Sequence, residues 1–153
     1  MKYWLIKSEP ATFGIDSLVA APRRRTGWDG VRNYQARNML RDEMRKGDLA
    51  FFYHSSCDVP GIYGIVKVVK AGYPDPTAFE RGHHHYDPDS DPAAPRWFMI
   101  DVELVRRLAN PITLDTLKAN AHTLGDLIVL RKGNRLSIMP VTADQWRRVL
   151  ALG

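Results

Sequence analysis

The chain has a single cysteine, Cys57, in 153 residues, which excludes an internal disulfide and fits a reducing compartment. Acidic residues are also in deficit. Asp and Glu number 17 against 22 Lys and Arg, for a formal net charge of +5. That balance favours an anionic partner, although charge alone does not distinguish nucleic acid from an anionic metabolite.

Long apolar runs are absent too. No stretch is long enough to span a bilayer, and residues 1–7 place a lysine on each side of a short apolar run, unlike a secretory signal. The chain has no internal repeat and no linker, and its composition, 44% hydrophobic and 25% charged, is ordinary for one globular domain. We therefore expect a single domain over residues 1–153, located in the cytoplasm.

Short runs rich in β-branched and aromatic residues predict strands. Four are clear and two are weaker: Tyr3–Ile6, Leu49–Tyr53, Ile62–Val69 and Trp97–Leu104, then Leu127–Leu130 and Leu136–Met139. Between the third and fourth of these, the segment Tyr73–Arg96 contains five prolines and many aspartates, which predicts a long surface loop. We call this segment the excursion. Loops of such length are often functional or mobile.

Helices are predicted from apolar spacing and from capping residues. Asn33 is the expected N-cap of a helix whose apolar face holds Ala36, Met39, Leu40 and Met44 and which ends at Lys46-Gly47. Thr142 and Gln145 form a capping-box pattern ahead of an apolar stripe, which predicts a C-terminal helix. Shorter helices are expected at Ile15–Val19 and Leu114–Asn120. Strands with inserted helices favour a small mixed α+β barrel over a doubly wound sheet.

Two patterns resemble metal sites, but neither predicts metal binding. Asp87–Asp91 has the spacing of an opening calcium loop, but Pro92 and Phe98 stand where a glycine and a bidentate glutamate are needed. The adjacent histidines, His83–His85, point in different directions and have no further ligand pair, so a solvated loop is the better interpretation. We expect no metal and no cofactor.

The segment that begins at Trp28 carries the most chemistry. Trp28 lies between glycines and has no apolar periodicity around it, so core burial is less natural there than for Trp4 or Trp146. An accessible indole would stack on a nucleobase with about 1–3 kcal/mol. Asp29 or Asn33 would then meet the edge of the base.

Two other groups of residues have competing interpretations. Arg23, Arg24 and Arg25 directly precede it, and are either a solvated basic turn or contacts to phosphate; both remain open. His54–Cys57 place a base beside possible nucleophiles, but adjacent residues rarely reach each other in catalytic geometry and no nucleophile-elbow motif is present. These groups are better suited to hydrogen bonding with a ligand or with loop backbone.

Five segments in one order resemble the EVE domain family and together run through essentially the whole chain. They are Tyr3–Pro10, Trp28–Asn38, Phe52–Cys57, Tyr73–Pro76 and Arg135–Val141. The resemblance implies a PUA-like pseudobarrel of mostly antiparallel strands with flanking helices, similar in fold to YTH domains. EVE domains are proposed to bind modified bases, particularly modified cytosines in DNA.

The resemblance also implies a set of ligand-binding residues. The pocket would be lined by Lys7, Ser8, Glu9, Trp28, Asp29 and Gly30, with His54 and Ser55 close by and with Asn33, Tyr34 and Arg37 at its rim. The resemblance does not supply a second aromatic wall, for which our own candidates are Tyr53 and Trp97. The histidines of the excursion and Arg23–Arg25 are not part of the family's motifs.

The leading hypothesis is a non-catalytic module that reads a modified cytosine, or a methylated adenine, in DNA or RNA. The base would be single-stranded or flipped out of a duplex. A small hydrolase of modified nucleosides or RNA on the same fold is an alternative, with Lys7, Glu9 and His54 as acid and base. A metabolite-binding or protein-interaction adaptor is another.

Overall fold

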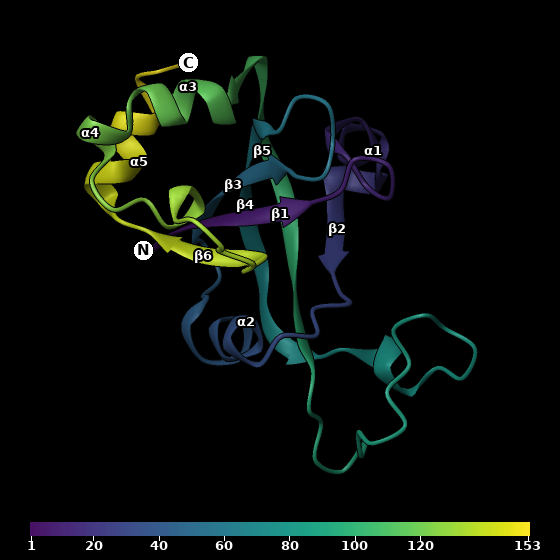
Figure 1. The fold of residues 1–153 in the computed structure, drawn as a ribbon. Coiled ribbons are helices and arrows are strands. Elements are labelled where there is room, and N and C mark those ends of the chain that lie inside the picture. The colour runs from purple at the N-terminus through teal and green to yellow at the C-terminus, as the bar shows by residue number, and fades with distance from the viewer.

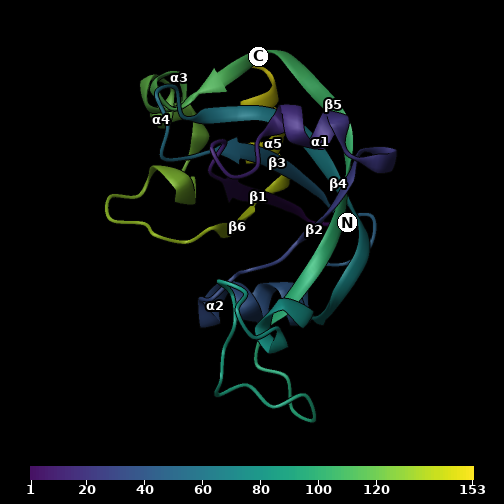
Figure 2. The same ribbon diagram turned by 90° about the vertical axis from the view of Figure 1, so that its right-hand side faces the viewer.

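The computed structural model describes all 153 residues and contains one curved, six-stranded sheet (Figures 1 and 2). The strands are β1 (Tyr3–Ser8), β2 (Arg25–Trp28), β3 (Leu49–His54), β4 (Gly61–Pro74), β5 (Phe98–Thr113) and β6 (Ile138–Val141). Their order in the sheet is β2-β5-β4-β3-β1-β6, and only the β1–β3 pair is parallel. The end strands β2 and β6 do not pair with each other, so the barrel is open.

Short helices cover the sheet. They are α1 (Ile15–Ala20), α2 (Tyr34–Asn38) with a π-helical continuation η2 (Met39–Glu43), α3 (Leu114–Ala119), α4 (Ala121–Leu124) and α5 (Ala143–Leu150), besides the 3₁₀ turns η1 (Pro22–Arg24), η3 (Pro76–Phe79) and η4 (Ile128–Leu130). The helices α3, α4 and α5 gather at one end of the molecule, and α2 lies at the other (Figure 1). No helix has the length and apolar character needed to cross a membrane.

Two hydrophobic cores form, one on each face of the sheet. Along β1, Trp4 and Ile6 belong to the core shared with α1 and α2, whereas Leu5 belongs to the core shared with α5. Side chains of a strand alternate between faces, so β1 contributes to both cores. In the second core, Trp146 of α5 stacks on Phe51 with 3.9 Å between ring centroids. A strand buried on both faces is continuously apolar, which explains the run at β3.

The predicted helix caps are confirmed. Asn33 accepts a hydrogen bond from the backbone N–H of Ala36 at 3.0 Å. Thr142 and Gln145 cap each other's backbone N–H groups at 3.1 and 3.0 Å. The helix after Asn33 ends at Glu43, however, earlier than the predicted Lys46-Gly47. Single-sequence patterns fix helix boundaries least well.

Several predicted strands need correction. Leu127–Leu130 is not a strand; most of it forms the 3₁₀ turn η4, which the bond from the N–H of Leu130 to the carbonyl of Leu127 closes. Strand β6 begins at Ile138, two residues later than predicted. β4 and β5 extend beyond their apolar runs because they pair with each other through a long ladder interrupted by bulges. β2 and α4 were not predicted.

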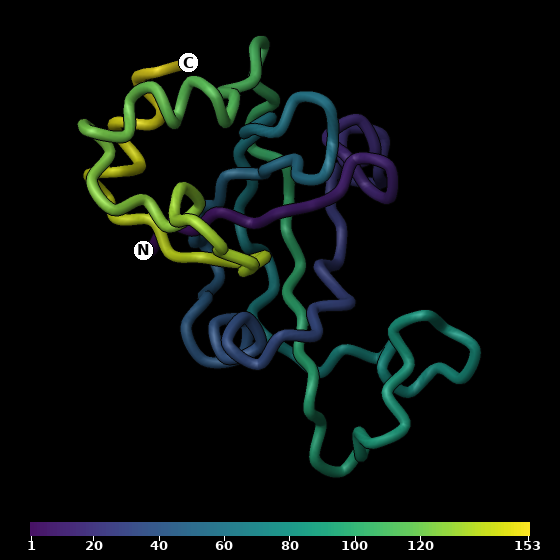
Figure 3. Tube along the Cα trace, viewed as in Figure 1, coloured from purple at the N-terminus to yellow at the C-terminus, as the bar shows by residue number.

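The excursion projects from the ends of β4 and β5 (Figure 3). A hydrogen bond of 2.9 Å from the backbone N–H of Asp75 to the carbonyl of Trp97 closes its neck. Apart from η3, it is largely irregular, as predicted.

Asp48 is a buried carboxylate that ties the N-terminus to the turn before β3. It accepts hydrogen bonds from the indole Nε1 of Trp4 and from the backbone N–H groups of Lys2 and Arg45, each at 3.0 Å. Three donors therefore depend on one side chain.

Replacing Asp48 with alanine should lower the free energy of unfolding by about 2–4 kcal/mol, because buried donors lose their acceptor. Urea denaturation followed by tryptophan fluorescence measures the change. The exposed Asp58 offers a matched control, and Asp58→Ala should stay within about 0.5 kcal/mol of the parent protein. Equal effects of the two substitutions would contradict the role of Asp48.

Candidate functional site

A hollow of about 660 Å³ lies where the ends of β1 and β2 meet the excursion. Its walls are Lys7, Ser8, Glu9, Thr12, Phe13, Thr26, Gly27, Trp28, Asp29, Gly30, Val31, Arg32, His83, His84, His85 and Ser137. The hollow thus brings together six of the residues that sequence had suggested, Lys7 to Glu9 and Trp28 to Gly30. Their roles in binding stay predictions.

The turn after β1 forms one wall of the hollow. The backbone N–H groups of Thr12 and Phe13 both donate to the carbonyl of Glu9 at 2.9 Å, and the hydroxyl of Ser8 donates to the carbonyl of Phe13. This turn leaves the Glu9 carboxylate exposed and brings the aromatic ring of Phe13 to the hollow. Phe13 was not recognised from sequence because it lies between the segment Tyr3–Pro10 and the predicted helix Ile15–Val19 and belongs to neither.

Lys7 alternates with Ser8 on β1, so its side chain extends toward the opposite face of the sheet. Its ammonium lies 5.9 Å from the centroid of the Tyr53 ring, which belongs to the second core. Burial lowers the pKa of Lys7. Lys7 therefore lines the hollow while its ammonium lies near the ring of Tyr53.

Trp28 lines the hollow but is also part of the first core, which corrects the expectation that this indole is not buried. The physical reason is its strand: β2 pairs with β5, with Trp28 opposite Ile100, and the pleat turns the indole inward. There it meets the edge of Phe52 at 5.5 Å and 85°. Truncation of Trp28 would also remove core packing, so it is a poor test of binding alone.

The segment from Asp29 to Arg32 is held by Asp75, a fully buried carboxylate. Asp75 accepts hydrogen bonds from the backbone N–H of Gly30 at 2.8 Å, from Arg32 at 3.0 Å, and from the backbone N–H and hydroxyl of Thr77 at 2.9 and 2.6 Å. Burial alone raises the pKa of Asp75, but the bonds from Thr77, Gly30 and Arg32 outweigh it and hold this pKa below its ordinary value.

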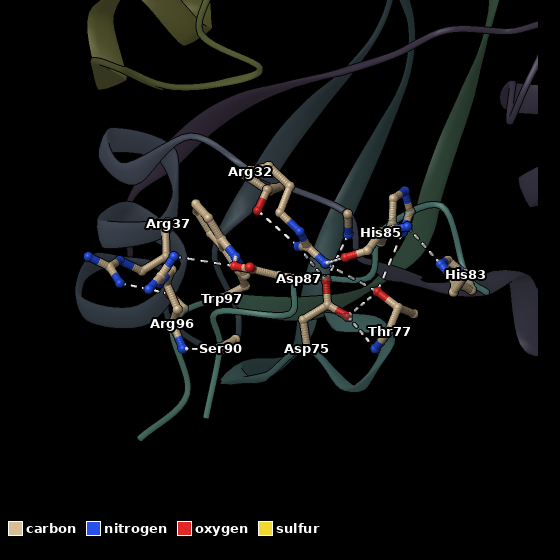
Figure 4. A network of polar contacts seen from close by, with 12 residues as sticks. Arg32, Arg37, Asp75, Thr77, His83, His85, Asp87, Ser90, Arg96 and Trp97 are labelled. Atoms are coloured by element: carbon tan, nitrogen blue, oxygen red, sulfur yellow. Dashed lines mark hydrogen bonds and ion pairs between the residues drawn. The ribbon is translucent and has the colours of Figure 1, made fainter. Parts of the chain in front are cut away.

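Arg32 connects the same segment to the excursion, as Figure 4 shows. Besides Asp75, its guanidinium donates to the carbonyl of His85 at 2.8 Å and contacts the hydroxyl of Thr77 at 3.4 Å. Its carbon Cζ lies 5.3 Å from the ring centroid of Trp97. One guanidinium thus contacts the start of the excursion, at Asp75 and Thr77, and also its later part, at His85.

Gly30 lets the excursion approach the segment that follows β2. Its φ is +74°, and a Cβ added there would collide with the imidazole of His85. His85 therefore packs against bare backbone, which brings the histidine trio, His83, His84 and His85, to the lip of the hollow. The trio was expected to be a solvated loop, and its place in this wall was not predicted. No group of three or more His, Cys, Asp or Glu side chains is arranged to hold a metal ion.

Tyr34, Arg37 and Trp97 do not line the hollow. Tyr34 stacks on Trp97 with 5.0 Å between ring centroids, and Arg37 donates to the carbonyl of Arg96 at 2.7 Å. In Figure 4 Trp97, Arg37 and Arg96 lie on one side of Arg32 and the histidines lie on the other. Asn33 is occupied as the cap of α2. The proposed rim is therefore a separate surface cluster.

Tyr53, His54 and Ser55 also lie outside the lining of the hollow. His54 accepts a hydrogen bond at Nε2 from the backbone N–H of Ile15 at 3.0 Å and stacks on Tyr63 at 3.9 Å. Burial lowers the pKa of His54, in keeping with a neutral acceptor. Burial raises the pKa of Tyr53 to about 12. His54 anchors the start of α1, and Ser55 donates its backbone N–H to Ser8.

The three arginines before Trp28 do not line the hollow either. Arg23 and Arg24 are exposed and adopt positive φ values of 56° and 54°. Arg25 begins β2 and pairs with Glu103 at 3.4 Å. Because Arg25 and Trp28 are three residues apart on one strand, their side chains lie on opposite faces. Contact of these arginines with phosphate stays a prediction.

An open, curved, mostly antiparallel sheet with flanking helices and a hollow at the strand ends defines a mixed α+β, PUA-like protein. The chain belongs to the EVE domain family, whose model matches residues 2–152. It is 48% identical to human thymocyte nuclear protein 1 over 165 aligned residues, which cover 98% of this chain and 73% of that protein.

Solved structures agree with this assignment. The structure of the human protein THYN1 in complex with DNA that contains 5-methylcytosine matches with a TM-score of 0.92 and 47% identity, over 99% of this chain and 97% of that one. A protein from Pseudomonas syringae matches with a TM-score of 0.91 and 49% identity, over 98% of both chains. The predicted fold class and family are confirmed.

Asp75 should make stability depend on acid pH. Its pKa is lower in the folded state than in the unfolded chain, so its contribution is present above the ordinary value near 4 and is lost as pH falls through the folded pKa. We expect Asp75→Asn to lower the free energy of unfolding by about 1–3 kcal/mol at pH 7. The difference from the parent protein should shrink below about pH 4.

Urea denaturation at pH 7, 4 and 3 measures both effects, with Asp58→Asn as the control for a lost surface charge. A deficit of the Asp75 variant that stays constant over this range would contradict the proposed ionised state of Asp75.

Proposed function

We propose that the protein is a non-catalytic nucleic-acid-binding domain that takes one modified base, a modified cytosine first of all, into the hollow. One observation carries the proposal: over 99% of its length the chain matches, at 47% identity, a human protein whose structure is a complex with 5-methylcytosine DNA. The net charge of +5 supports a polyanionic partner. DNA is favoured over RNA by this relative.

The composition of the hollow supports a base as its occupant. Trp28 and Phe13 supply apolar wall, while Ser8, Glu9 and Asp29 supply polar groups. Carboxylates accept hydrogen bonds from the exocyclic amine of cytosine or adenine. Since the hollow opens at the surface between strand ends, the base would enter it single-stranded or flipped, at an unstacking cost of a few kcal/mol.

The arrangement of side chains favours binding over hydrolysis. The acid and base suggested for a hydrolase were Lys7, Glu9 and His54. His54 is bonded to the start of α1 at Nε2, and the ammonium of Lys7 lies against Tyr53. His54 does not line the hollow with Lys7 and Glu9, so the three groups do not converge and we propose no reaction. Residence in the cytoplasm stays a prediction.

Asp29 offers the sharpest test of base recognition, because it is exposed at the hollow. The quantity to compare is the ratio of affinities for an oligonucleotide with 5-methylcytosine and one with an abasic site at the same position. Loss of a carboxylate near DNA also reduces general repulsion, and the ratio cancels that effect. Asp29→Ala should lower the ratio about tenfold, because it removes the acceptor and a good base-edge contact contributes about 1–3 kcal/mol.

Fluorescence anisotropy with labelled single strands gives both affinities, and Asp58→Ala is the charge-matched control outside the hollow. A wild-type ratio near one would exclude the hollow as a base site. A normal ratio in the Asp29 variant would remove only Asp29 from it.

A further inference from the structure

The histidine trio presents imidazole nitrogens at the lip of the hollow. Its ring centroids lie 4.6 Å apart for His83 and His84, 3.9 Å for His84 and His85, and 4.8 Å for His83 and His85. Arg32 and Gly30 fix the trio in place by the carbonyl bond and the close packing already described. The three rings therefore have fixed positions in the wall of the hollow.

Some ring nitrogens are engaged and others are left for a ligand. Nδ1 of His83 accepts the backbone N–H of His85 at 3.0 Å, and Nδ1 of His85 contacts the hydroxyl of Thr77 at 3.4 Å. Nε2 of His83 remains, together with the exposed ring of His84, whereas the imidazole of His85 packs against Gly30. His83 accepts at Nδ1, so its neutral ring carries the proton at Nε2 and donates from there. The exposed ring of His84 has both nitrogens available for donation once it is protonated, and donors clustered in this way suit an oxyanion.

Charged groups face the trio from two elements. Asp29 and Arg32 come from the segment after β2, and Lys7 and Glu9 border the hollow at the end of β1. Within the excursion, Glu80, Arg81 and Asp87 flank the trio in sequence. Burial lowers the pKa of His85, the neighbouring His84 acts in the same direction, and Asp29 opposes them. The surroundings of His85 thus disfavour its protonated form unless an anion compensates the charge.

We propose that the histidine trio is a proton-coupled phosphate subsite, which binds the backbone phosphate of the nucleotide whose base occupies the hollow. This inference rests on the proposed function and adds a second ligand group to it. The anion is a nucleic-acid phosphodiester rather than free phosphate, because the trio borders the base site itself.

Binding would then take up a proton. A phosphate beside the trio favours the imidazolium form, so by linkage the affinity for nucleic acid rises as pH falls through the histidine range. One additional phosphate contact also steepens the dependence of log affinity on log salt concentration by about one. Both effects are absent from a base site made only of carboxylates and aromatic rings.

The experiment measures the affinity of the whole chain for a single-stranded oligonucleotide with 5-methylcytosine at pH 7.5 and 5.5, each at two salt concentrations. We expect binding about tenfold tighter at pH 5.5 and a salt slope steeper by about one. An otherwise identical oligonucleotide carries neutral methylphosphonate linkages on both sides of the modified base. With it the pH response of the wild-type protein should disappear.

The matched variants replace the trio by polar groups that do not titrate. His83→Asn and His85→Asn keep an acceptor near the place of Nδ1, and His84→Gln keeps the bulk of an exposed ring. The triple variant should bind with the same affinity at both pH values. His122→Gln, an exposed histidine of α4, should keep the full wild-type response.

The outcomes separate the two proposals. A wild-type affinity that does not change with pH, or a response that persists with the neutral linkages, would overturn the phosphate subsite and leave the base site standing. Failure of the wild-type protein to bind any oligonucleotide at either pH would overturn both. The neutral-linkage measurement uses the unaltered chain, so it does not depend on the folding of a variant.

Discussion

The ion pair between Arg32 and Asp75 is the interaction on which the site depends. The carboxylate is fully buried and the arginine side chain is 24% exposed, with 3.0 Å between nitrogen and oxygen. A buried pair compensates its desolvation only if its remaining donors and acceptors are bonded. Gly30 and Thr77 complete the bonding of Asp75, and His85 and Thr77 add to that of Arg32, whose Nε alone lacks a partner. The pair therefore contributes more to the position of the neighbouring segments than to the free energy of unfolding.

What this pair positions is the excursion, which would otherwise have little to pack against. Arg32 holds the carbonyl of His85 on one side and faces the ring of Trp97 on the other. Asp75 closes the neck through its backbone N–H and orders the segment from Gly30 to Arg32 through its carboxylate. A loop rich in proline and aspartate thereby becomes a fixed wall opposite β1 and β2. Rigid walls matter for recognition because a ligand then spends less free energy on ordering the site.

Much of the fold was predictable because it rests on local patterns. Apolar runs gave the central strands, and the caps at Asn33 and Thr142 gave helix starts that the structure confirms. The short strand β2 escaped prediction because Arg25–Trp28 is mostly polar or glycine and becomes a strand only by pairing with β5. The burial of Trp28 follows from that pairing. The run at Leu127–Leu130 is apolar for a different reason, since a 3₁₀ turn packs part of it into the second core.

The site was half predictable for a related reason. The family motifs predicted Ser8, Glu9, Trp28 and Asp29 as pocket residues, and these residues line the hollow because they lie at or next to the ends of β1 and β2. The histidine trio depends instead on a contact between residues 43 positions apart in sequence, Arg32 and Asp75. No periodicity encodes such a contact. Likewise, residues that follow Trp28 closely in sequence, such as Tyr34 and Arg37, lie beyond Arg32 on a different surface, because the chain turns into α2.

The commitment of Trp28 to the core also bears on selectivity within the proposed function. A ring held against Phe52 is a fixed wall and does not close around a methyl group. Burial of one methyl contributes about 0.8 kcal/mol, or about a fourfold preference. Hydrogen bonds at the base edge contribute more, about 1–3 kcal/mol each. Under the proposed function we therefore expect the hollow to distinguish one base from another more strongly than 5-methylcytosine from cytosine, and strong preference for the methyl group would require walls that close further when the base enters.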